Sequence, residues 1–125
     1  MGMILLDSNI IIYLSKELIS IDELFVDSEE YGISVIIYME VLGYVFESEY
    51  ERRFIEDFMS CMSCLNIIYI NEVIANKVIE LKQTISIKLP DAIICATAMI
   101  NDYILITNDT RLKNINNLNI QIIKL

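Results

Sequence analysis

The chain has 125 residues and a net charge of −9 at pH 7, from 18 acidic and 9 basic residues. Its length predicts a single domain over residues 1–125, and a mean hydropathy of +0.52 predicts elements that are buried on both faces. No apolar run reaches the length of a membrane span and no secretory signal is evident, so we expect a cytoplasmic protein. The acidic balance disfavours simple nucleic-acid binding and favours either a basic partner or acids gathered around a metal ion.

The cysteines do not form a recognisable metal site. Cys61, Cys64 and Cys95 all lie in apolar stretches predicted to be helical, and the chain has no histidine. An odd number of cysteines without a signal peptide favours reduced thiols. A closed zinc site cannot be completed from these residues, so we expect them to pack inside helices.

The first half of the chain begins with a short strand. Met3–Leu6 is apolar and too short for a helix, which favours a strand buried on both faces. A helix is predicted next over Ser8–Leu14, capped by Ser8 or Asn9. The elements predicted after it are a short helix over Ser20–Phe25, a strand over Gly32–Val35 and an almost wholly apolar helix over Ile36–Phe46.

The second half repeats the alternation of helices and strands. An amphipathic helix is predicted over Glu47–Cys64, with Arg52, Arg53, Glu56 and Asp57 on its solvent side. The elements predicted after it are a strand over Ile67–Ile70, a helix capped by Asn71 and ending near Thr84, a helix from Pro90 to about Ile100, a strand over Tyr103–Ile106 and a last strand over Ile120–Ile123. This alternation predicts an α/β fold: a mainly parallel sheet of about five strands with helices on both faces.

Two acids directly follow predicted strands. Asp7 comes after the first strand, and Asp109 follows the strand that ends near Ile106. In an open α/β sheet, the groups that do chemistry lie beyond the carboxyl ends of the strands. The alternatives are a helix cap for Asp7 and a turn residue for Asp109, while Asp102 is assigned to a surface turn with Asn101.

Two more acids lie in apolar helices. Glu40 has no Lys or Arg one helical turn away, so on a helix that is apolar all round it would be buried and unpaired, which is costly without a cation. Its alternative is a position at the rim that reaches solvent. Asp91 follows Pro90 in the first turn of its helix, where the helix dipole alone could account for it.

Four carboxylates close together would repel one another and require a cation. Ligation by oxygen alone, with no His or Cys, suits Mg²⁺ or Mn²⁺ and disfavours zinc or non-haem iron. The absence of His also removes the usual general base, so hydrolysis at this site would need water activated by the metal.

Four motifs, in this order and spacing, resemble those of PIN-domain proteins. They are Ile4-Leu5-Leu6-Asp7-Ser8-Asn9, Ile33-Ser34-Val35-Ile36-Ile37-Tyr38-Met39-Glu40, Leu89-Pro90-Asp91-Ala92 and Leu105-Ile106-Thr107-Asn108-Asp109. The resemblance covers essentially the whole chain, and the size and layout are similar to those of VapC toxins of type II toxin–antitoxin pairs.

The resemblance implies an endoribonuclease that depends on Mg²⁺ or Mn²⁺, with Asp7, Glu40, Asp91 and Asp109 as catalytic and metal-binding residues. It further implies that Ser8 or Asn9 and Thr107 orient those carboxylates. Water activated by the metal would hydrolyse the RNA phosphodiester to a 5′-phosphate and a 3′-hydroxyl. The implied partners are an RNA substrate, a cognate antitoxin whose tail enters the groove, and a second copy of the chain in a homodimer.

The chain departs from the family pattern at one position and adds a few basic residues near the acids. Many relatives carry a further Asp shortly after the last motif, where this chain has Leu112, so the number of metal ions is left open. The basic residues Lys16, Lys88, Arg111 and Lys113 could form a rim for RNA phosphates or be ordinary solvated surface charges.

Other classes of protein remain as alternatives. A PIN-like binding module with little or no catalysis could act through a protein partner. A phosphate-accepting receiver domain would need an acceptor Asp after the third strand, which ends at Ile70-Asn71. A haloacid-dehalogenase-type phosphatase would need D-x-D where Asp7-Ser8-Asn9 stands, and no Gly-rich phosphate loop is present.

Overall fold

The computed structural model describes residues 3–20, 30–61 and 65–124. Within them five strands form one parallel sheet in the order β3-β2-β1-β4-β5. The strands are β1 (Ile4–Leu6), β2 (Tyr31–Ser34), β3 (Leu65–Ile68), β4 (Ile104–Thr107) and β5 (Ile120–Ile122). The predicted α/β fold with a parallel sheet is therefore confirmed.

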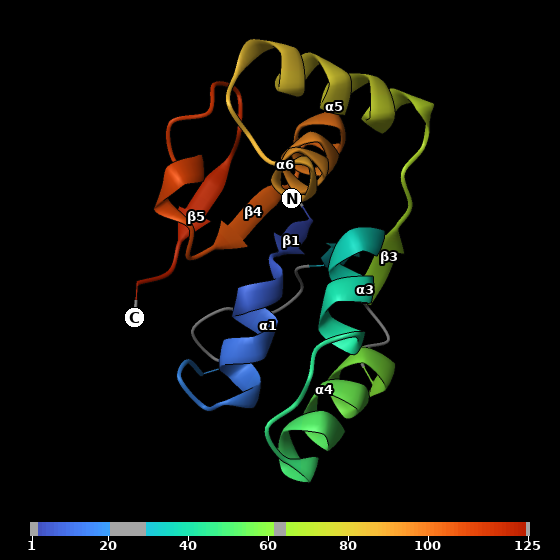
Figure 1. Cartoon of the computed structure of the whole chain (residues 1–125), viewed down its shortest axis with the longest axis vertical. Helices are drawn as coiled ribbons and strands as arrows, with labels where there is room; N and C mark the ends of the chain where they lie inside the picture. Colours follow the sequence, from blue (N-terminus) through green and yellow to red (C-terminus); the bar gives the residue numbers. More distant parts are fainter. Residues whose placement is uncertain (1–2, 21–29, 62–64, 125) are drawn as a thin grey trace.

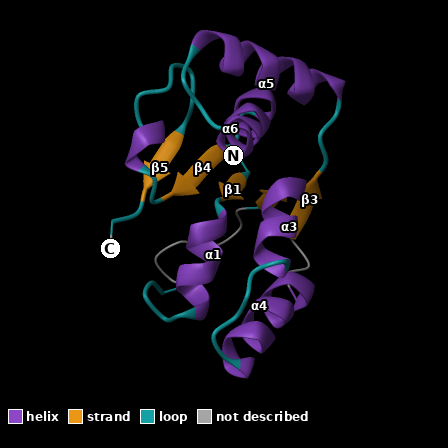
Figure 2. Ribbon diagram, in the orientation of Figure 1, coloured by secondary structure: helices purple, strands orange, loops and turns teal. Residues whose placement is uncertain are grey.

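Helices cover both faces of the sheet (Figures 1 and 2). In the view of Figure 1 the strands form a band across the middle, with one group of helices below the band and another above it. The lower helices are α1 (Ser8–Ser15), α3 (Val35–Leu42) and α4 (Glu49–Cys61), and the upper ones are α5 (Glu72–Thr84) and α6 (Leu89–Asn101). A short 3₁₀ helix, η1 (Thr110–Leu112), follows β4.

The chain order of the strands reverses between β1 and β4. From β1 the chain steps outwards to β2 and then β3, and it returns to the other side of β1 as β4 and then β5. Connections on the two sides of such a point leave the sheet towards opposite faces, which opens a crevice beyond the carboxyl ends of the two strands. Asp7 follows β1 and Asp109 follows β4 closely, so both acids lie at this crevice.

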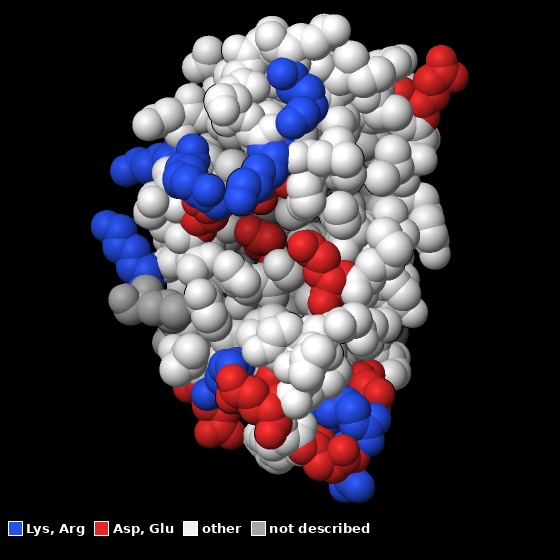
Figure 3. All heavy atoms as spheres, viewed as in Figure 1, with Lys and Arg blue, Asp and Glu red and all other residues white. Residues whose placement is uncertain are grey.

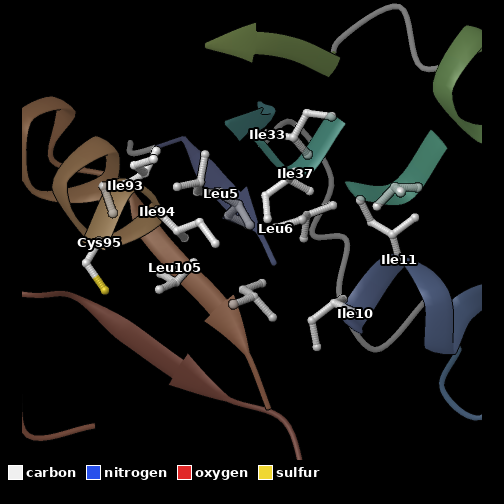
Figure 4. Packing of buried hydrophobic residues seen from close by; sticks show 14 of the residues in the cluster. Leu5, Leu6, Ile10, Ile11, Ile33, Ile37, Ile93, Ile94, Cys95 and Leu105 are labelled. Atoms are coloured by element: carbon white, nitrogen blue, oxygen red, sulfur yellow. The ribbon is translucent and has the colours of Figure 1, made fainter. Parts of the chain in front are cut away.

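The core lies between the sheet and its two helical layers. Leu5, Leu6, Ile33 and Leu105 are fully buried on β1, β2 and β4, and the side chains labelled in Figure 4 pack around them. On α6 all the side chains from residue 92 to 98 are buried, so this helix is the central one of its layer. Burial of this apolar surface is the main contribution to stability.

Cys95 belongs to this core, as predicted for a structural cysteine. Its thiol is free and fully buried, and burial followed by the charges of nearby acids raises its pKa to about 12. A thiol with so high a pKa stays protonated and unreactive at neutral pH. Cys64 and the side chain of Cys61 lie outside the described residues.

Short polar side chains begin the helices that follow the strands. Asp7 caps α1, Ser34 accepts a hydrogen bond from the N–H of Ile36 in α3, and Asn71 accepts one from the N–H of Ile74 in α5. Each cap satisfies a backbone donor that the helix itself leaves unpaired. Pro90 lies in the first turn of α6, where its missing N–H has no consequence.

Several boundaries differ from those predicted. The third strand ends at Ile68 because its partner β2 ends at Ser34, which leaves Tyr69 and Ile70 outside the ladder and exposed. The helix predicted to run to Phe46 ends at Leu42, with Gly43 as its cap. The helix predicted over Ser20–Phe25 lies, apart from Ser20, outside the described residues.

In the described part of the chain, no helix is long and apolar enough to cross a membrane.

Candidate active site

Asp7 is held in place at the end of β1. It is 7% exposed, its Oδ1 accepts a hydrogen bond from the N–H of Ser8 at 2.7 Å, and its Oδ2 accepts one from the hydroxyl of Thr107 at 2.5 Å. Its own N–H donates to the carbonyl of Ile106 in β4 at 3.0 Å. The predicted alternative role as a helix cap is therefore real, and it coexists with a contact across the crevice.

Thr107 joins the two acids that follow the strands. Its hydroxyl donates to Asp7 and accepts a hydrogen bond from the N–H of Asp109 at 3.1 Å. The Thr107 side chain is fully buried at the end of β4, so its position is fixed by the sheet. One hydroxyl thus fixes the spacing between the residue after β1 and the residue two positions beyond β4.

Arg111 connects Asp109 to Asp91. Its Nε and Nη2 donate to the two carboxylate oxygens of Asp109 at 3.0 and 2.7 Å, and its Nη2 lies 4.0 Å from Oδ2 of Asp91. The hydrogen bonds and charge of Arg111 lower the pKa of Asp109. Asp109 also caps η1 through the N–H of Arg111 at 2.9 Å. A guanidinium therefore lies between two of the acids predicted to bind a metal.

The acids act on one another electrostatically. Burial, and then the charges of Asp7 and Asp91, raise the pKa of Glu40. Burial, and then the charges of Asp109 and Asp7, raise the pKa of Asp91, against which Arg111 and Lys88 act. These couplings reach through space between residues from four different segments of the chain. The four predicted site acids therefore gather at one edge of the sheet. Figure 3 shows acidic side chains in the middle of one face, next to basic ones.

The prediction that Glu40 is buried on a wholly covered helix was wrong. Glu40 is exposed, and so are its neighbours Met39 and Leu42, because one side of α3 faces solvent despite its apolar sequence. Glu40 lies at the rim of the site and reaches solvent, which is the alternative considered from the sequence. Its raised pKa arises from partial burial and from the neighbouring carboxylates.

Two pockets flank the acids. One, of about 470 Å³, is lined by Asp91, Arg111 and Lys88 among others. The other, of about 560 Å³, is lined by Glu40 and Lys16 among others. Lys and Arg side chains lie directly beside the acidic ones in Figure 3. The basic residues considered from the sequence therefore lie on two sides of the site, with Lys88 and Arg111 on one side and Lys16 on the other.

The four predicted basic residues are not equivalent. Lys88 and Arg111 share the pocket of Asp91. Lys16 pairs with Glu47 at 3.2 Å and lies over the ring of Tyr44, 5.9 Å from its centroid, and these contacts raise the pKa of its ammonium. Lys113 is exposed and lines neither pocket.

Ser8 and Asn9 contact the site less directly than Thr107. Ser8 contributes its backbone N–H to Asp7, whereas the Asn9 amide donates to Oδ1 of Asn108 at 3.2 Å. Asn108 in turn donates to the hydroxyl of Tyr13 at 2.9 Å. Tyr13 and Asn108 were not identified from the sequence, although Asn108 lies inside the last motif between Thr107 and Asp109.

Leu112 explains the departure from the family pattern. Its side chain is 3% exposed and belongs to the hydrophobic core. A carboxylate at this position in the same orientation would be buried among apolar groups, at a high desolvation cost. In this chain the position supports η1 rather than the acidic site.

The donor atoms of the acidic site are those that a hard divalent cation prefers. Its ligands would all be carboxylates, and their mutual repulsion is the condition that a divalent cation relieves. As they are placed, however, no three acidic or cysteine side chains in the described residues are arranged to hold a metal ion. Arg111 supplies part of the missing positive charge.

The PIN-domain family model matches residues 4–118, and the chain belongs to this family. A chain of a toxin–antitoxin complex from Klebsiella pneumoniae is 30% identical over 91% of this chain and 93% of its own length, with a TM-score of 0.69. A chain of VapBC-1 from nontypeable Haemophilus influenzae is 27% identical over 96% and 97%, with a TM-score of 0.73. The DNA-bound VapBC of Salmonella typhimurium has the same fold at 24% identity, over 97% and 98% with a TM-score of 0.74. No curated protein matches the chain.

These findings confirm the resemblance noted in the sequence and support a toxin nuclease of the VapC type. Nucleases of this family generally use divalent metal ions. The roles of individual residues, and the ion itself, are the subject of the proposal that follows.

Proposed function

We propose that this protein is a metal-dependent endoribonuclease and the toxin of a type II toxin–antitoxin pair. Asp7, Glu40, Asp91 and Asp109 are its catalytic residues and hold Mg²⁺ or Mn²⁺. The observation that carries the proposal is the gathering of these acids at the crevice between β1 and β4. Thr107 joins Asp7 to Asp109 there, and Arg111 joins Asp109 to Asp91. The charges of Asp7 and Asp91 also contribute to the raised pKa of Glu40. Such a set of like charges persists at a functional site because a cation binds there.

The ion would supply an activated water for hydrolysis of the phosphodiester and positive charge for the phosphate. The residues of the chain position the reactants around it. Thr107 holds the carboxylate of Asp7 in one orientation by its hydroxyl, and Ser8 does so by its N–H, with Asn9 linking α1 to the loop after β4. Oriented carboxylates bind a metal better because less conformational freedom is lost on binding.

Basic residues beside the acids contact RNA phosphates in this proposal. Lys88 and Arg111 are the best placed, since both share a pocket with Asp91. Lys16 on the opposite side and Lys113 on the surface are secondary contacts. Positive charge confined to the site lets an acidic protein bind a polyanion locally.

The partners follow from the family and from the charge of the chain. We propose a homodimer, in the cytoplasm, that a cognate antitoxin inhibits by placing a segment in the acidic groove. The net charge of −9 favours a basic antitoxin segment. The similar chains from Klebsiella pneumoniae and nontypeable Haemophilus influenzae come from a toxin–antitoxin complex and from VapBC-1, respectively.

Cleavage of single-stranded RNA by the purified chain tests this function. We expect cleavage with Mg²⁺ or Mn²⁺, none in EDTA, and none for Asp7→Asn, whose fold should be intact by circular dichroism. Asp57→Asn, an exposed acid on α4, should cleave like the wild type. Metal-dependent cleavage that survives Asp7→Asn would overturn the assignment.

A binding module without catalysis is the second candidate. The hydrogen bonds between Arg111 and Asp109 favour it, because they already neutralise part of the site without a metal. Absence of cleavage in every metal, together with tight binding of the product of a small reading frame directly upstream, would favour this candidate.

A further inference from the structure

The pocket beside Asp91 concentrates positive charge in an acidic protein. Lys82, Lys88 and Arg111, three of the 9 basic residues of the chain, line it, and Asp91 is its one acidic lining residue among the described residues. It lies where the end of α5, the connector to α6 and η1 meet. Lys82 lies outside the four motifs of the site, on the preceding helix α5, and was not identified from the sequence.

The cationic groups keep donors free for a ligand. Lys82 donates one hydrogen bond from Nζ, to the carbonyl of Ile87 at 2.7 Å, which leaves two of its three donors. Lys88 forms no ion pair with any described residue. Arg111 is oriented by Asp109 through Nε and Nη2, so its Nη1 remains available. The pocket is therefore prepared for an anion.

The rest of the pocket wall is mainly apolar. Its apolar lining residues are Ile85, Ile87, Leu112 and Ile115, and its uncharged polar ones are Ser86 and Asn114. Its volume of about 470 Å³ lies within the range of about 300 to 1,000 Å³ that small-ligand pockets occupy. An anion alone needs neither this space nor an apolar wall, whereas a nucleotide uses both, because its base has an apolar face and its phosphate a negative charge.

We propose that this pocket is a subsite for one nucleotide of a single-stranded RNA. Lys82, Lys88 and Arg111 bind a phosphate adjoining the acids, and the base lies against the wall formed by Ile85, Ile87 and Ile115. The inference rests on the proposed function, since the site beside Asp91 is where the RNA would be cut. It adds a defined place for the nucleotide next to the scissile bond and gives Lys82 a role.

Binding in EDTA tests the subsite without any need for cleavage. A fluorescently labelled single-stranded RNA is titrated with the full chain at several salt concentrations. Lys82→Gln and Lys88→Gln should each weaken binding about tenfold, as expected for the loss of one charge-assisted hydrogen bond. Each should also reduce the slope of log affinity against log salt by about 0.7, the value for one phosphate contact of a single strand.

Matched variants separate binding from folding and from general charge. Lys77→Gln removes the same charge from the same helix outside the pocket, and it should leave both affinity and salt slope unchanged. If Lys82→Gln fails to fold because its bond to Ile87 is lost, Lys88→Gln, which has no such bond, still decides the matter. Wild-type affinity and slope for Lys88→Gln would overturn the subsite.

Small probes distinguish a nucleotide from a bare anion or an acidic peptide. Uridine 5′-monophosphate should shift the NMR signals of residues in the pocket, and inorganic phosphate at the same concentration should shift them much less. Equal shifts by phosphate, or shifts by an acidic peptide alone, would overturn the proposal. If RNA binds through these lysines but is never cleaved, the proposed function fails while the subsite stands. If the chain cleaves RNA and the lysine variants cleave it equally well, the subsite fails while the proposed function stands.

Discussion

The hydroxyl of Thr107 donates a hydrogen bond of 2.5 Å to Oδ2 of Asp7, across the crevice between β4 and β1. The two residues are 100 positions apart in sequence, and both are buried. Because the same hydroxyl accepts from the N–H of Asp109, it sets the distance between two site acids. The sheet, by placing β1 beside β4, is what brings this arrangement about.

Thr107→Val removes the hydroxyl and keeps the shape of the side chain. It leaves a buried carboxylate oxygen of Asp7 without its donor, which should destabilise the protein by about 1 to 3 kcal/mol. Loss of the orienting group should lower RNA cleavage about 10- to 100-fold. Thermal unfolding and initial cleavage rates measure the two effects.

The matched control is Thr97→Val on α6. Its hydroxyl is equally buried but donates only to the carbonyl of Ile93 in its own helix. We expect a smaller loss of stability and unchanged cleavage. Equal effects of the two substitutions on cleavage would contradict the role of Thr107.

Glu40→Gln should stabilise the protein at pH 7 in EDTA. The pKa of Glu40 is raised from 4.5, so its ionised form is disfavoured in the folded state. Its destabilising effect is therefore present above the folded pKa and disappears as the pH falls below about 4.5. Because the side chain is largely exposed, solvent screening limits the gain to about 0.5 kcal/mol.

The gain in Tm should shrink as the pH is lowered from 7 towards 4.5, the ordinary pKa of a Glu carboxyl. Added Mg²⁺ should raise the Tm of the wild type more than that of Glu40→Gln. Asp57→Asn serves as the control for loss of an exposed charge. A lower Tm for Glu40→Gln in EDTA at pH 7 would contradict the repulsion that we describe.

Arg111→Gln should increase the affinity for a divalent ion. The guanidinium now occupies Asp109 with two hydrogen bonds and lies 4.0 Å from Asp91, so a cation must compete with it for these carboxylates. Titration calorimetry with Mn²⁺ measures the change, and Arg53→Gln on α4 is the control. Unchanged or weaker Mn²⁺ binding would show that Arg111 and the ion do not share ligands.

The fold could be predicted from sequence because the strands are short apolar runs separated by helical ones. The four acids could be selected because they interrupt apolar segments or end strands. The reason given for Glu40 was nevertheless incorrect, since an apolar helix sequence does not reveal which side faces solvent. Glu40 reaches the site because α3 begins directly after β2, at the same edge of the sheet as Asp7.

Other features depended on tertiary contacts that local patterns do not contain. Lys82 reaches the site because α5 ends beside α6, and the pairing of Arg111 with Asp91 depends on how η1 follows β4. The shift of β3 by two residues, relative to the predicted strand, is set by its register with the neighbouring strand β2, which pairs Tyr31 with Leu65 and Ser34 with Ile68. Periodicity within one segment carries no information on these relationships.

A crystal structure of the protein grown with Mn²⁺ tests the central claim most directly, because anomalous scattering locates the ion independently of activity. We predict one or more Mn²⁺ peaks between Asp7, Glu40, Asp91 and Asp109, with Arg111 turned away from Asp109. Saturating Mn²⁺ with no peak among these carboxylates, or with the ion bound elsewhere, would contradict the account.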